Sequence, residues 1–252
     1  METKQYERLL EILNKLRVEC PWDRKQTFDS LRSNTIEECF ELCDALTDKD
    51  YMGVKEELGD MLLHIIFYSK IAEEQGLFNI EDVAEFVSEK LIYRHPHVFG
   101  DVKVKNDEEV SKNWAALKLK EKKGDKTGVL AGVPRSLPAL IKAYRMQKKA
   151  ANVGFDWDNK EDVWNKVKEE IAEFEAEIDN NDFEAQQDEF GDLLFSLINA
   201  GRKLGIDPEV ALEKCNKKFL YRFNYIEKHS DKPINEMTLP EMEDLWVEAK
   251  KH

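Results

Sequence analysis

The side chains best suited to chemistry in this chain are two sets of acids that repeat with the same spacing. The first set reads E-E-x-x-E and then E-x-x-D, and consists of Glu37, Glu38, Glu41, Glu57 and Asp60. The second set has the same pattern 132 residues later (169 − 37, 192 − 60), and consists of Glu169, Glu170, Glu173, Glu189 and Asp192. Each set leads into an apolar run. Acids repeated in register beside apolar segments indicate a duplicated site for a hard cation.

On a helix, residues three or four apart lie on one face, so Glu38 and Glu41 project together, as do Glu57 and Asp60. If their helices are antiparallel neighbours, four carboxylates meet in each copy and repel one another unless a cation is bound. Ligands that are all oxygen favour Mg²⁺, with Mn²⁺ as the second choice. The predicted metal ligands are Glu38, Glu41, Glu57 and Asp60 in the first copy and Glu170, Glu173, Glu189 and Asp192 in the second.

A pair of cations also repeats. Lys90 and Arg94 lie four residues apart, and so do Lys218 and Arg222. Such a pair is usually part of a solvated face, but beside a metal site it is well suited to binding phosphate oxygens. We therefore predict these four residues to bind substrate phosphates.

The elements that must position these residues are helices. Apolar residues recur at spacings of three and four along most of the chain, with helix starts at Asn79 and Asp207-Pro208 and helix ends at Gly76 and Gly205. A polar stretch bearing glycine and proline separates two similar halves. We expect an all-α protein with an N-terminal helical domain at 1–120, a linker at 121–138 and a C-terminal helical domain at 139–252.

Composition excludes several other classes of protein. The net charge of −14 argues against stable nucleic-acid binding or attachment to a membrane surface. The four cysteines have no zinc-site spacing, and neither a P-loop motif nor a GxSxG motif is present. No apolar run approaches membrane-spanning length, and the first residues do not form a secretory signal, so we expect a cytoplasmic protein.

Beyond these patterns, the chain resembles the MazG nucleoside triphosphate pyrophosphohydrolases, and specifically their two-domain members. The resemblance covers nearly the whole chain and rests on the acidic pattern, on C-P-W-D at 20–23, on K-L-I-Y-R-H-P-H-V-F-G-D at 90–101 and on V-G-F-D-W at 153–157. It implies two tandem MazG-like antiparallel helical domains that form helix bundles on dimerisation, and hence a homodimer or higher homo-oligomer. It also implies Mg²⁺-dependent hydrolysis of NTP or dNTP substrates to nucleoside monophosphate and pyrophosphate, with cleansing of the nucleotide pool as the expected role.

Carried over to this chain, the resemblance identifies the eight acids as metal ligands and adds Trp246 to Lys218 and Arg222 as a substrate-binding residue. Glu170 or Glu38 is the expected catalytic residue, which orients the attacking water and helps to remove its proton. The first copy has Leu91 and His95 where the second has phenylalanines, so we expect the second copy to be the better catalyst. The alternative is a helical interaction or regulatory module that binds metal and nucleotide without turnover.

Overall fold

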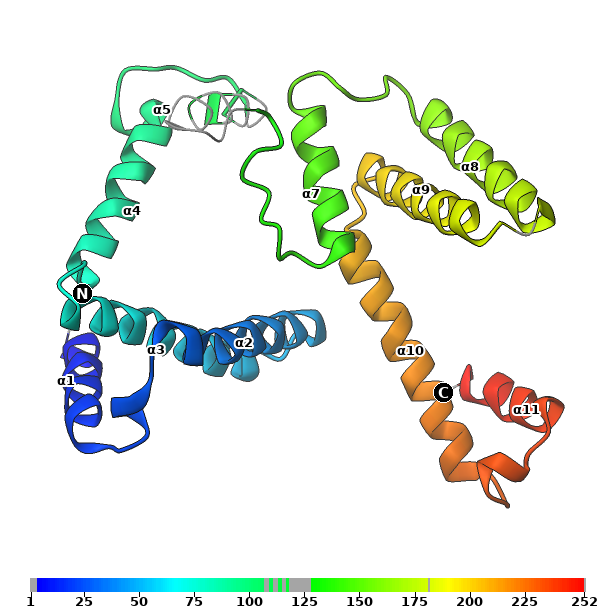
Figure 1. The fold of residues 1–252 in the computed structure, drawn as a ribbon, viewed down its shortest axis with the longest axis horizontal. Helices are drawn as coiled ribbons and strands as arrows, with labels where there is room; N and C mark the ends of the chain where they lie inside the picture. The colour runs from blue at the N-terminus through cyan, green and yellow to red at the C-terminus, as the bar shows by residue number, and fades with distance from the viewer. Residues whose placement is uncertain are drawn as a thin grey trace. The chain divides into compact units, whose positions relative to one another are not determined.

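The computed structural model describes residues 4–106, 109–110, 113–114, 117, 128–180 and 182–251. All regular structure among these residues is helical, which confirms the all-α prediction. The chain divides into two compact units, Met1–Leu117 and Lys118–His252, and each is described by itself (Figure 1). The predicted linker lies partly outside the described residues, so the predicted domain limits stay a prediction.

The first unit is built around a helical hairpin. Helices α2 and α3 pack side by side, and α1 packs against α3 (Figure 1). The elements in chain order are α1 (Lys4–Glu19), the 3₁₀ turn η1 (Asp23–Lys25), α2 (Phe28–Asp48), α3 (Tyr51–Glu74), α4 (Ile80–Arg94) and the short α5 (Pro96–Phe99).

The second unit repeats this plan. Helices α8 and α9 form the hairpin, α7 packs against α9, and the long α10 packs against α11 and α7 (Figure 1). The elements are α7 (Ala139–Ala151), α8 (Lys160–Asn180), α9 (Phe183–Lys203), α10 (Pro208–His229), η2 (Ile234–Glu236) and α11 (Leu239–Ala249).

The two hairpins have the same register to the residue. Helix α2 covers 28–48 and α8 covers 160–180, while α3 begins at 51 and α9 at 183, each offset by 132. Asp50 and Asp182 cap the second helix of each hairpin, because each carboxylate accepts hydrogen bonds from the backbone N–H groups two and three residues further on. The duplication read from the acids therefore extends to the helix boundaries.

Helix ends follow the predicted signals. Asn79 caps α4 in a capping box, and Asp207 caps α10 with Pro208 in the first turn. Gly76 and Gly205 follow the ends of α3 and α9 with φ of +67° and +76°. Residues with a Cβ rarely adopt this left-handed conformation, so glycine is well suited to reversing the chain at these positions.

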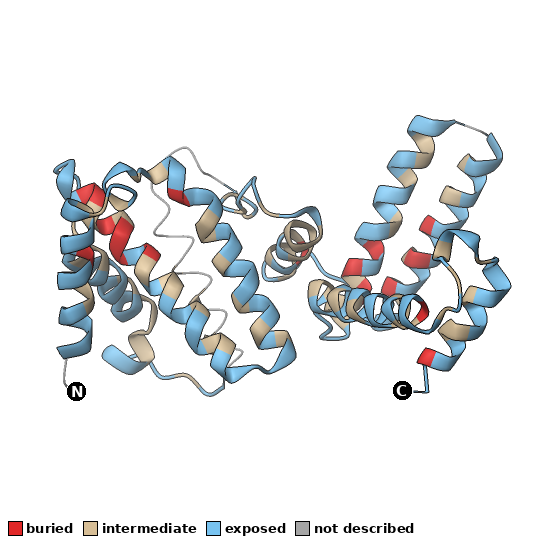
Figure 2. Cartoon of the chain, turned by 90° about the horizontal axis from the view of Figure 1, so that it is seen from below, coloured by how far each residue is buried: buried red, intermediate tan, exposed pale blue. Residues whose placement is uncertain are grey.

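The apolar core of the first unit lies where α1 meets the hairpin, whereas that of the second unit lies between α8 and α9. Most of the remaining helical surface is exposed (Figure 2). The first unit buries five apolar side chains in one cluster, namely Leu13, Leu31, Ile66, Phe67 and Ile71. The second unit has a smaller cluster of Val163, Val167 and Ala200. The first unit therefore has the larger packed core.

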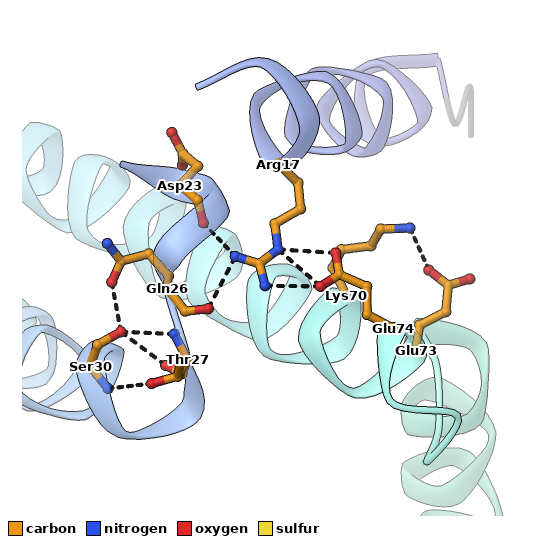
Figure 3. Close-up of polar contacts among 8 residues, drawn as sticks. All are labelled: Arg17, Asp23, Gln26, Thr27, Ser30, Lys70, Glu73 and Glu74. Carbon is orange, nitrogen blue, oxygen red and sulfur yellow. Dashed lines mark hydrogen bonds and ion pairs between the residues drawn. The ribbon is translucent and has the colours of Figure 1, made fainter. Parts of the chain in front are cut away.

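One arginine ties the elements of the first unit together (Figure 3). Arg17 of α1 donates hydrogen bonds to both carboxylate oxygens of Glu74 at the end of α3, at 2.8–3.1 Å. Its guanidinium also donates to the carbonyl oxygens of Asp23 and Gln26, in and beside η1. Arg17 lowers the pKa of Glu74, first through these hydrogen bonds. One buried cation thus fixes α1, η1 and α3 relative to one another.

None of the helices within the described ranges combines the length and the apolar composition needed to cross a membrane.

Candidate active site

The hairpin of the first unit brings three of the predicted ligands together. Glu38 and Glu41 come from one face of α2 and Glu57 from the facing turn of α3, and each offers an oxygen within 4.8 Å of the others. We call these residues the first acidic cluster. Asp60 follows one turn after Glu57 and lies outside this group of three. Its charge nevertheless contributes to raising the pKa of both Glu38 and Glu57.

The electrostatics of the first acidic cluster are those of an uncompensated group of anions. Burial raises the pKa of Glu38 and Glu57, and the neighbouring carboxylates raise it further. The Oε2 atom of Glu57 is buried and has no hydrogen-bond partner among the described residues. A buried carboxylate oxygen without a partner is costly, and a bound cation would remove that cost.

The second hairpin repeats the arrangement in the second acidic cluster, which consists of Glu170, Glu173 and Glu189, again with oxygens within 4.8 Å of one another. Glu170 is buried, with 6% of its surface exposed. Burial raises the pKa of Glu189, as do the charges of Glu173, Glu170 and Asp192. Asp192 lies outside the group of three, as Asp60 does in the first unit.

Lys166 distinguishes the second acidic cluster from the first. Its Nζ lies 2.6 Å from Oε1 of Glu169, 2.8 Å from Oε1 of Glu170 and 3.9 Å from Oε2 of Glu173. The hydrogen bonds to Glu169 and Glu170 raise the pKa of Lys166, so the side chain stays charged. The residue at the matching position of the first unit is Asn34 (166 − 132).

Sequence reasoning missed Lys166, although its spacing of three and four from Glu169 and Glu170 was a usable signal.

Both clusters fit a hard divalent cation. Their donors are all carboxylate oxygens, which suit Mg²⁺ or Mn²⁺ rather than zinc. In the second unit the ammonium group of Lys166 already lies 2.8 Å from Glu170 and 3.9 Å from Glu173, so this position accommodates positive charge. In the first unit the partnerless oxygen of Glu57 leads to the same conclusion.

The predicted phosphate-binding residues lie on other helices. Arg222 of α10 lies over the ring of Trp246 on α11, with its guanidinium carbon 5.4 Å from the ring centroid. Phe219 contacts the same ring edge-on, with centroids 5.2 Å apart. Lys218 is exposed on α10, four residues before Arg222. The structure therefore groups the second-unit residues that we predicted to bind substrate.

The matching pair in the first unit is arranged in a similar way. Arg94 lies over Trp114 at 5.3 Å, and Lys90 lies over Phe86 at 5.3 Å. In neither unit does a hydrogen bond or ion pair between described residues join these cations to the acidic cluster.

A cavity of about 580 Å³ adjoins the second acidic cluster. Lys166, Glu170 and Asp192 line it on the side of the cluster. The rest of its lining comes from α7, α8, α9, the loop between α7 and α8, and Leu130, which precedes α7. Its size is that of a small-molecule site. Sequence reasoning did not predict this cavity.

Comparison with known families assigns each half of the chain. Residues 26–99 match the model of the MazG nucleotide pyrophosphohydrolase domain. Residues 140–219 match the model of phosphoribosyl-ATP pyrophosphohydrolase. One match falls in each compact unit, so the prediction of two tandem domains of this type is confirmed.

Relatives match the chain from end to end. The nucleoside triphosphate pyrophosphohydrolase/pyrophosphatase MazG of Thermotoga maritima is 42% identical over 250 residues, which cover 97% of this chain and 95% of that protein. A nucleoside triphosphate pyrophosphohydrolase of Escherichia coli is 41% identical over 256 residues, covering 98% and 97%. At this identity and coverage, the chain belongs to the MazG family of nucleoside triphosphate pyrophosphohydrolases.

Proposed function

We propose that this protein hydrolyses nucleoside triphosphates, both NTP and dNTP, to nucleoside monophosphate and pyrophosphate in a Mg²⁺-dependent reaction, in the service of cleansing the nucleotide pool. The observation that carries the proposal is the second acidic cluster, whose three carboxylates converge beside a cavity large enough for a nucleotide. The names of the full-length relatives support the same activity.

Each residue of the second unit has a role in this proposal. Glu170, Glu173, Glu189 and Asp192 hold the metal ion. When bound, Mg²⁺ supplies positive charge that offsets the charge of the triphosphate and acidifies water. Lys218 and Arg222 bind the phosphates and stabilise the charge that develops on the leaving pyrophosphate. Trp246 holds the guanidinium of Arg222 in place. Glu170 is the residue that we assign to orient the attacking water.

In the first unit, the proposed metal ligands are Glu38, Glu41, Glu57 and Asp60, with Glu38 in the catalytic position. Lys90 and Arg94 are the corresponding phosphate-binding pair.

We further propose that the chain forms a homodimer or higher homo-oligomer through its hairpins. Helices α3 and α9 expose apolar side chains at three matched positions, and each of these side chains is between 38% and 53% exposed. They are Leu58, Leu62 and Ile65 in α3 and Phe190, Leu194 and Leu197 in α9. The spacing of four and three places each trio on one face of its helix. Contiguous apolar surface of this kind marks an interaction site. Association would also offer a way to complete the site, because no hydrogen bond or ion pair between described residues joins its acidic and cationic halves.

The experiment that tests the function is product analysis with each common NTP and dNTP in Mg²⁺. We expect nucleoside monophosphate and pyrophosphate in equal amounts, and loss of both when EDTA is present. Release of nucleoside diphosphate and phosphate would contradict the proposed bond cleavage. Absence of turnover with every nucleotide would favour the alternative, a helical module that binds metal and nucleotide without catalysis.

A further inference from the structure

We infer that the cavity beside the second acidic cluster is a nucleobase pocket, in which Gln147 accepts a hydrogen bond from the base and thereby contributes to substrate selection. This inference rests on the proposed function, because the triphosphate at the acidic cluster is what brings the base to the cavity. Gln147 lies outside both the acidic pattern and the cationic pairs.

The cavity exists because the second unit has small or polar side chains where the first has large ones. With the offset of 132, Phe67 corresponds to Asn199, Leu31 to Val163 and His64 to Ser196. Leu31, His64 and Phe67 are buried in the first unit, and Leu31 and Phe67 belong to its core cluster. Asn199, Val163 and Ser196 all line the cavity. The same part of the fold is packed in one unit and open in the other.

The two units also differ in the side-chain hydrogen bonds at these positions. Thr35 Oγ1 lies 2.7 Å from Nδ1 of His64 and 2.7 Å from the hydroxyl of Tyr68, so three side chains satisfy one another inside that unit. Their counterparts are Val167, Ser196 and Ala200, which cannot form such a network. The second unit has therefore lost both the bulk and the polar contacts that close this space.

Gln147 supplies the feature that points to a ligand. It is the buried residue of α7, whereas the buried residue of α1 is Leu13. Its Nε2 donates a hydrogen bond of 2.8 Å to the carbonyl oxygen of Phe195, which fixes the amide orientation because only the nitrogen can donate. The Oε1 atom is buried and has no partner among the described residues. A group that fills the cavity and donates a hydrogen bond would satisfy it.

Asn199 supplies a complementary donor. Its Oδ1 accepts hydrogen bonds from Nε and Nη2 of Arg202, at 3.0 and 2.8 Å, so its Nδ2 remains as a donor. Arg202 is itself held by an ion pair with Asp156. The cavity thus offers a fixed acceptor and an oriented amide donor.

A nucleobase matches these properties better than a sugar or a simple anion. Bases present N–H donors and ring or carbonyl acceptors on their edges, and their flat faces stack on aromatic rings. Phe155 and Trp157 line the cavity and are exposed enough to provide such faces. An anion alone would leave the acceptor of Gln147 unsatisfied. Lys166 and Glu170 line the same cavity, so a nucleotide spans both regions without a break.

The test measures binding of the two reaction products by calorimetry in the presence of Mg²⁺, since one product has a base and the other has none. For Gln147→Leu we expect the Kd of nucleoside monophosphates to rise about fivefold, the effect of one lost hydrogen bond, while the Kd of pyrophosphate stays within about twofold. For Asn199→Phe, which introduces the residue of the first unit, we expect a rise of more than about tenfold, because the ring occupies the cavity.

Gln186→Leu is the matched control. Gln186 also donates its amide to a backbone carbonyl, that of Glu177, but does not line the cavity. Thermal melting shows whether each variant is folded. If Gln147→Leu does not fold, the monophosphate affinity of Asn199→Phe tests whether the cavity binds the base. Unchanged monophosphate affinity in the folded variants would overturn the inference, and so would an equal loss of pyrophosphate affinity. A wild-type protein without NTP turnover would refute the proposed function instead.

Discussion

The two units have the same hairpin with the same register, but the interior between the hairpin and the first helix is packed in one unit and contains a cavity in the other. In the first unit, α1 and the hairpin enclose a continuous apolar cluster that includes Leu13, Leu31 and Phe67. In the second, α7 and the hairpin surround a cavity that Gln147 and Asn199 line. Packed apolar side chains favour stability, whereas an open polar cavity favours binding. One scaffold thus appears twice, first with a closed interior and then with an open one.

The acidic clusters differ in a parallel way. In the first, no lysine or arginine of the described ranges forms an ion pair with its carboxylates, and the pKa of Glu38 and Glu57 is raised by burial and mutual repulsion. In the second, Lys166 forms ion pairs with Glu169 and Glu170. The pKa of Glu189 in the second cluster is raised by the same two causes, so the clusters differ mainly in the ion pairs of Lys166.

The strongest test of the comparison replaces the matched glutamates Glu189 and Glu57 by glutamine. We expect Glu189→Gln to lower kcat/KM for NTP hydrolysis about a thousandfold, because a metal ligand beside the open cavity is lost. We expect Glu57→Gln to lower it less than about threefold. Pyrophosphate release provides the measurement. Equal losses in the two variants would mean that both units catalyse.

The second test concerns packing. We expect Phe67→Ala to lower the free energy of unfolding by about 3–4 kcal/mol, because it leaves a void in the larger core. We expect Asn199→Ala, at the matched position, to lower it by only about 1–2 kcal/mol, because the change removes the hydrogen bonds from Arg202 but leaves no new void beside the existing cavity. Urea denaturation measures both. A cost for Asn199→Ala as large as that for Phe67→Ala would show that the second interior is packed.

The third test uses Arg17 and pH. We expect Arg17→Met to lower the free energy of unfolding by about 1–2 kcal/mol at pH 7, a value reduced by solvent screening around Glu74. Because the pKa of Glu74 is lowered in the folded protein, this contribution is present above the unfolded pKa of the carboxyl group and is lost as pH falls through the folded one.

Melting curves from pH 7 down to pH 3 should therefore bring wild type and Arg17→Met together at the acidic end. A gap between them that does not change with pH would argue that Arg17 acts through its carbonyl contacts to Asp23 and Gln26 alone.

The smallest expected effect comes from exchanging the residues at positions 34 and 166. Lys166→Asn removes the ammonium group from the second acidic cluster, so we expect its affinity for Mn²⁺ to rise about threefold in the absence of nucleotide. Asn34→Lys should lower the affinity of the first cluster by a similar factor, about threefold. Titration calorimetry with Mn²⁺ measures both, and weaker Mn²⁺ binding in Lys166→Asn would reverse the assignment of Lys166 as a competing cation.

Local patterns predicted much of the fold and of the acidic clusters. Helical spacing places Glu38 beside Glu41, and the capping residues Asn79 and Asp207 mark helix starts, because both effects act within one or two turns. The same logic would have found Lys166. The internal repeat predicted two similar domains, and the family resemblance predicted their type; the comparisons confirm both.

The cavity could not be predicted in this way, because it depends on which helices pack together. That α7 lies against α9 is a contact between residues about fifty positions apart, as the hydrogen bond between Gln147 and the Phe195 carbonyl illustrates. The structural effect of the difference between Phe67 and Asn199 can be recognised only when the packing of the helices is known. The arrangement of Lys218 and Arg222 relative to the acids is likewise not local, and it stays a prediction.

The apolar stripe on α3 has a consequence for synthesis of the chain. Leu58, Leu62 and Ile65 lie in the first unit, so the stripe is complete while residues 118–252 remain to be translated. At about 5–20 residues per second, translation of that remainder takes roughly 7–27 s. During this interval the exposed stripe of a nascent chain can meet that of a chain on a neighbouring ribosome. For the association proposed above, the order of the two units along the chain would let contact begin during translation, with the better-packed unit emerging first.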